Sequence, residues 1–99
     1  MNKQQQEQLG FMTMWVSQWQ VGLDLAHART YKRLAPSKHE QFQIDSMDWH
    51  AYMARKECLE LGMDPEIVLQ PALITCADRW YSDNVKGTED EWCFEEAAQ

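Results

Sequence analysis

The chain has 99 residues, which is enough for one hydrophobic core and too short for two. Apolar residues make up 44% of the sequence and charged residues 25%, as in ordinary globular domains, so wholesale disorder is excluded. The 9 Lys and Arg residues against 16 Asp and Glu residues give a net charge of −7, which disfavours non-specific binding to DNA or to anionic membranes.

The first predicted element is a long helix. Residues 1–8 are rich in glutamine and are expected to be frayed, so the helical domain is predicted to cover residues 9–82. From Leu9 onward apolar residues recur every three or four positions, which predicts a helix that ends before Pro36. Its main apolar stripe comprises Leu9, Met12, Val16, Trp19, Leu23, Ala26 and Thr30.

A second apolar stripe lies on nearly the opposite side of this helix and comprises Met14, Val21, Leu25 and Ala28. A helix with two apolar faces either lies at the centre of its domain or forms an oligomer interface. The chain is too small to cover every apolar face, so a homodimer through the first helix is one expectation.

The second predicted helix starts at a clear signal. Ser37 followed by Glu40 matches a capping box, in which two side chains satisfy free backbone N–H groups at a helix start. Gly62 suits the position just beyond the end of this helix. Asp45 and Ser46 leave open a restart of the helix in the middle of this segment.

The third predicted helix starts after Asp64, which can cap it, with Pro65 in its first turn. It is expected to reach about residue 80, and Pro71 should kink or split it. Residues 83–99 form an acidic and aromatic segment, which predicts a tail or a short last helix. No strand pattern is present, so the predicted fold class is all-α: a small bundle of three main helices plus a short C-terminal helix or tail.

The polar start of the chain and the short apolar runs predict neither a signal peptide nor a membrane span. Three scattered cysteines do not suggest a disulfide scaffold, so a cytoplasmic protein is expected.

Six residues could bind zinc in principle: His27, His39, His50, Cys58, Cys76 and Cys93. None of them forms a Cys-x-x-Cys or His-x-x-x-His pair, so no metal site and no cofactor is predicted, and Cys58 is interpreted as a core residue. Paired carboxylates such as Asp45 and Asp48 are interpreted as solvated surface, since general acid–base catalysis needs burial to shift a pKa. No catalytic residue is predicted.

The surplus of aromatic residues is the best indication of function. Five Trp, three Tyr and three Phe residues exceed what three short helices need inside. On the second helix, the face opposite the core stripe carries Phe42, Trp49, Tyr52 and Met53, beside the acids Asp45 and Asp48. Trp, Tyr and Met are enriched at protein interfaces. The alternative is that both faces of this helix pack within the domain.

We therefore predict a small, acidic, non-enzymatic regulator or inhibitor that binds a larger protein. The four apolar side chains would act as anchors and the two acids as a rim. The mechanism would be steric occlusion of a basic or nucleic-acid-binding surface, as by blockers that phages and other mobile elements encode.

The segment 29–38 supports an alternative function. Its cations are Arg29, Lys32, Arg33 and Lys38, and residues 1–38 hold five Lys and Arg against two Asp and Glu. A helical module that binds RNA or DNA through these four residues is the alternative hypothesis.

Overall fold

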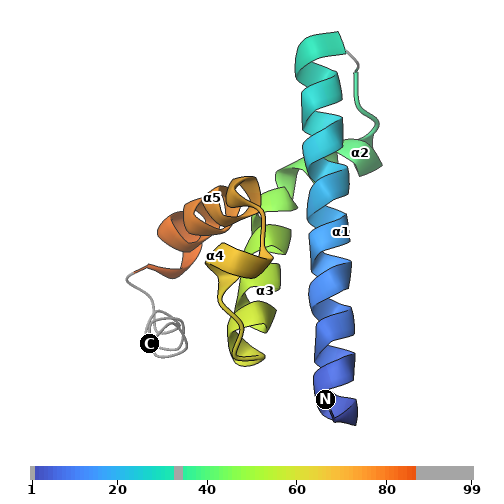
Figure 1. Cartoon of the computed structure of the whole chain (residues 1–99). Helices are drawn as coiled ribbons and strands as arrows, with labels where there is room; N and C mark the ends of the chain where they lie inside the picture. The colour runs from blue at the N-terminus through green and yellow to red at the C-terminus, as the bar shows by residue number, and fades with distance from the viewer. Residues whose placement is uncertain (1, 33–34, 87–99) are drawn as a thin grey trace.

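The computed structural model describes residues 2–32 and 35–86, and these residues contain helices and no strand. The predicted all-α class is therefore confirmed. The elements are α1 (Lys3–Lys32), α2 (Lys38–Asp45), α3 (Met47–Glu60), α4 (Pro65–Val68), α5 (Pro71–Trp80) and a short π-helix, η1 (Tyr81–Val85). Figure 1 shows α1 as a long rod along one side of the molecule, and α3 packs on both α1 and α5.

The start of α1 differs from the prediction. The helix begins at Lys3 rather than at Leu9, so residues 3–8, which were expected to be frayed, are helical. Asn2 supplies the cap: its Oδ1 accepts a hydrogen bond from the Gln5 N–H at 2.8 Å, and its own N–H donates to Gln5 Oε1 at 3.0 Å. The expectation of fraying was based on the glutamine-rich composition and did not take the capping residue Asn2 into account.

The main stripe of α1 faces the core, as predicted. Met12 and Trp19 are buried, and Leu9, Val16, Leu23 and Ala26 are half-buried against the core, whereas Thr30 is exposed. The second stripe lies outside: Met14 and Val21 are exposed, and Leu25 and Ala28 are half-buried. α1 is therefore an edge helix of the monomer with one apolar side uncovered.

The predicted second helix is divided at Ser46, where the sequence allowed a restart. The Glu40 N–H donates to Ser37 Oγ at 3.1 Å and the Ser37 N–H donates to Glu40 Oε1 at 2.9 Å, so the capping box is confirmed. α2 ends at Asp45, and α3 starts at Met47. Between them, Ser46 Oγ donates to the Phe42 carbonyl at 2.7 Å, and the same carbonyl accepts the Ser46 N–H at 3.0 Å. A serine hydroxyl bonded back to the preceding turn often bends a helix, as at this break.

The remaining predicted boundaries are also confirmed. Gly62 has a φ of +77°, the left-handed conformation expected just beyond a helix end. Asp64 Oδ1 accepts from the Glu66 N–H at 2.9 Å and caps α4. Pro71 splits the third predicted helix and becomes the first residue of α5. The expected tail or last helix falls mainly on residues 87–99, which lie outside the described residues.

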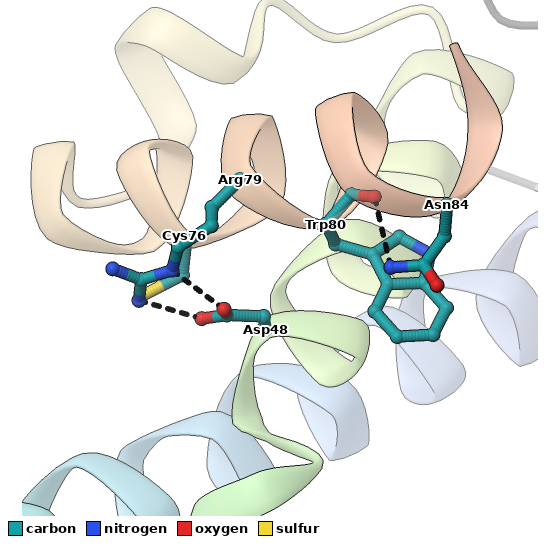
Figure 2. A network of polar contacts seen from close by, with 5 residues as sticks. All are labelled: Asp48, Cys76, Arg79, Trp80 and Asn84. Carbon is teal, nitrogen blue, oxygen red and sulfur yellow. Dashed lines mark hydrogen bonds and ion pairs between the residues drawn. The ribbon is translucent and has the colours of Figure 1, made fainter. Parts of the chain in front are cut away.

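Two ion pairs fix α5 on α3. Arg79 donates to both carboxylate oxygens of Asp48, at 2.6 Å and 2.8 Å, and buried Arg55 pairs with Asp78. Figure 2 shows the Arg79–Asp48 pair beside the Cys76 sulfur. A planar guanidinium that binds a carboxylate through two bonds restricts orientation as well as distance, so this pair favours the observed placement of α5 on α3. Among the helices described, none has the length and hydrophobicity to cross a bilayer.

Candidate protein-interaction surface

A surface hollow of about 350 Å³ lies where the end of α2, the start of α3 and the end of α5 meet. We call it the aromatic hollow. Its lining residues are Phe42, Asp45, Ser46, Trp49 and Trp80. The hollow lies at the α2–α3 break at Ser46, and the Arg79–Asp48 pair joins the end of α5 to the start of α3.

The three aromatic residues differ in how firmly they are held. Phe42 is 64% exposed and projects from α2. Trp49 is half-buried, with its ring edge-on to that of Trp15 at a centroid distance of 5.1 Å. Trp80 is half-buried against the core, and its carbonyl accepts from Asn84 Nδ2 at 3.2 Å (Figure 2). The hollow thus has two packed walls and one exposed side chain at its edge.

The two acids predicted for the rim have different roles. Asp48 is occupied by Arg79, and this pairing raises the pKa of the guanidinium above its ordinary value. Asp45 is exposed, and its Oδ1 accepts a hydrogen bond from Gln41 Nε2 at 2.8 Å. It forms no ion pair with any residue in the described ranges. Asp45 is therefore the acid at this hollow that keeps its charge available.

Two of the predicted anchors do not reach the surface as expected. Tyr52 is only 8% exposed and belongs to the core, and Met53 is half-buried against that core. Tyr52 lies between Asp48 and Arg55, which both pair with α5, so it is on the side of α3 that α5 covers. Of the six predicted site residues, Phe42, Asp45 and Trp49 line the hollow.

Trp80 was not predicted as a site residue. It lies three and four positions after Ala77 and Cys76, which are buried, so its spacing alone places it in the core stripe of α5. It is only half-buried and lines the hollow at the point where α5 continues into η1. No sequence signal specifies the crossing angle that turns its ring toward α2.

The basic segment is only partly described. Arg29 is exposed and donates through Nη1 to Gln41 Oε1 at 3.2 Å, and Lys38 is exposed in the first turn of α2. Arg33 and the side chain of Lys32 lie outside the described residues. Nucleic-acid binding by these four residues stays a prediction.

The residues considered for metal binding or catalysis are dispersed. Cys58 is fully buried in the core, as predicted. Burial raises the pKa of the Cys58 thiol and also that of the Cys76 thiol. His27 and His39 are exposed, and Cys93 lies outside the described ranges. Within residues 2–32 and 35–86, no three His, Cys, Asp or Glu side chains are grouped so as to hold a metal ion.

His50 is the one buried histidine of the described chain. Its ring lies 5.7 Å from that of Trp15 and 5.2 Å from that of Trp49, directly behind the aromatic hollow. Nδ1 has no hydrogen-bond partner among the described residues. Burial lowers the pKa of this imidazole, so the neutral form is the one that supports Trp49.

This arrangement predicts a loss of stability in mild acid. The pKa of His50 is about 6.5 in the unfolded chain and lower in the folded chain. Below about pH 6.5 the unfolded state takes up a proton that the folded state does not, so the free energy of unfolding decreases. Urea unfolding between about pH 7 and about pH 5 should show this decrease, and His50→Phe, which keeps a ring but cannot titrate, should show less of it. Equal decreases in the two proteins would contradict the assignment.

The sequence matches no protein-family model, and comparisons with curated proteins and with solved structures give no significant match.

Proposed function

We propose that the chain is a small non-enzymatic regulator or inhibitor that binds a larger protein through the aromatic hollow. The observation that carries this proposal is that aromatic side chains from three helices surround one hollow, with the available carboxylate of Asp45 at its rim. Aromatic residues, Trp and Tyr above all, are enriched in interaction hot spots, which cluster in pockets near the centre of an interface.

The chemistry of the hollow favours a basic group on the partner. Aromatic faces attract ammonium and guanidinium ions, and a nearby carboxylate adds an ionic contact. The net charge of −7 would steer the chain toward a basic surface. We therefore propose that an Arg or Lys side chain of the partner enters between Phe42, Trp49 and Trp80.

Occupation of a basic surface would exclude the partner's own nucleic acid or acidic ligand, so the proposed mechanism is steric occlusion. We propose the cytoplasm as the compartment, supported by the free thiols of Cys58 and Cys76.

The test compares matched surface variants in affinity capture from a native lysate. Phe42→Ser removes the exposed aromatic side chain, and Ile67→Ser removes an apolar side chain of α4 that is 82% exposed and lies outside the hollow. We expect Ile67→Ser to recover the same partner as the wild type and Phe42→Ser to recover at least about tenfold less, as for a hot-spot residue. Asp45→Asn should weaken capture most at low salt. Equal recovery by all variants would contradict the proposal.

Trp49→Ala is not a suitable first variant. Its ring packs on Trp15 and His50, so its removal would lower stability and partner binding together. A direct assay avoids this problem: an arginine-rich peptide should shift the indole N–H resonances of Trp49 and Trp80 in the wild type, and the shift should be smaller in Phe42→Ser.

A further inference from the structure

The outer side of α1 is apolar and uncovered. Phe11, Met14 and Val21 are 55%, 41% and 40% exposed, although their helix packs against α2 and α3 on its other side. Leu25 and Ala28 continue the same side but are half-buried beside Pro36 of the α1–α2 connection. The freest part of this face therefore lies between residues 11 and 21.

The spacing along this face is that of a coiled coil. Phe11, Met14, Gln18, Val21, Leu25 and Ala28 follow one another at intervals of 3, 4, 3, 4 and 3 residues. This is the alternation of core positions in a heptad repeat, in which a helix pairs with another helix along a narrow seam. The core of the domain uses other positions of α1, such as Met12 and Trp19, so both faces can be occupied at once.

We propose that this face binds a second copy of the chain, so that two α1 helices pair in parallel. Charge complementarity supports this occupant. Asp24 and Arg29 lie on opposite flanks of the seam, five residues apart. In a parallel pair, residues so placed lie close across the seam, so Asp24 meets the partner's Arg29 and Arg29 meets the partner's Asp24.

Both charges are available for such contacts. Asp24 is exposed and accepts a hydrogen bond from Gln20 Nε2 at 3.0 Å, and Arg29 is exposed and donates to Gln41. Neither forms an ion pair with a residue in the described part of the chain. Pairing across the seam would therefore break no ion pair within the monomer.

Gln18 also favours the parallel arrangement. It is the polar residue within the seam, and a parallel pair places it opposite the partner's Gln18, where the two amides can hydrogen-bond. An antiparallel pair in the register that sets Met14 opposite the partner's Leu25 would place Gln18 against the partner's Val21, which leaves an amide against an apolar side chain. The orientation therefore needs its own test.

This proposal does not depend on the proposed function, because the seam and the aromatic hollow share no residue. Sedimentation equilibrium of the full chain across the micromolar range should give twice the monomer mass. Val21→Lys places a charge in the seam and should raise the dissociation constant by at least about a hundredfold. Ile67→Lys, with the charge on α4, should leave the dissociation constant unchanged. A monomer at all concentrations, or a dimer that Val21→Lys does not weaken, would overturn the proposal.

The orientation is tested by disulfide cross-linking in a Cys93→Ser background, in which Cys58 and Cys76 are buried. Gln18→Cys should cross-link to itself on oxidation if the helices are parallel. A mixture of Met14→Cys and Leu25→Cys proteins that forms the mixed disulfide, without self-linking of Gln18→Cys, would overturn the parallel arrangement. Because Val21 and Gln18 are accessible in the monomer, circular dichroism should confirm that these variants remain folded.

Discussion

Replacing Trp19 with Ala is expected to lower the free energy of unfolding by about 3–5 kcal/mol. Trp19 is fully buried and has the largest side chain of the core. It belongs to the same buried cluster as Leu73, Cys76 and Ala77 of α5. A single side chain thus joins two helices whose backbones have little direct contact.

The cavity left by this substitution cannot close easily. Other contacts, including the Arg79–Asp48 pair between α5 and α3, hold the surrounding helices in place. Domains of this size are stable by about 5–15 kcal/mol, so the loss is a large part of the total. Urea unfolding should show it as a lower midpoint. Phe42→Ala is the matched control: it removes an exposed aromatic ring and should change the free energy of unfolding by less than about 0.5 kcal/mol. A loss below about 1 kcal/mol for Trp19→Ala would contradict the role assigned to the indole.

Short-range signals explain why much of the fold could be predicted. The capping box at Ser37, the position of Gly62 and the split at Pro71 each depend on residues within one turn of each other. The cap at Asn2, which starts α1, is also a signal within one turn of helix. It was not predicted because the first eight residues were assessed by their composition alone. The main apolar stripe of α1 was predicted because a helix of 30 residues repeats its period many times.

The candidate site depends on long-range geometry. Trp49 and Tyr52 lie three residues apart on one face of α3, and the sequence gives them the same expected exposure. In the structure Tyr52 is buried in the core, whereas Trp49 lines the hollow together with Trp80 of α5. α5 is held on α3 by the pair between Arg79 and Asp48, 31 residues apart, and by the packing of the shared core. No local pattern specifies either contact.

Replacing Gly22 with Ala is expected to destabilise the protein, although alanine is the better helix former. A Cβ atom at Gly22 would lie 2.6 Å from the Gln43 carbonyl oxygen and 2.8 Å from the Met47 Cβ. The first contact is with backbone, so α1 must move away from the α2–α3 junction. We expect a loss of about 1–3 kcal/mol from this overpacking, against a helix-propensity gain of about 1 kcal/mol.

Gly10 provides the control within the same helix. A Cβ there meets nothing within 4 Å, so Gly10→Ala should raise the free energy of unfolding by about 0.5–1 kcal/mol through backbone entropy. Urea unfolding of the two variants should therefore give changes of opposite sign. Stabilisation by both would show that the close approach at Gly22 is absent. Gln43 and Met47 flank Ser46, so the displacement at Gly22 should also distort the aromatic hollow, and Gly22→Ala should reduce partner capture where Gly10→Ala does not.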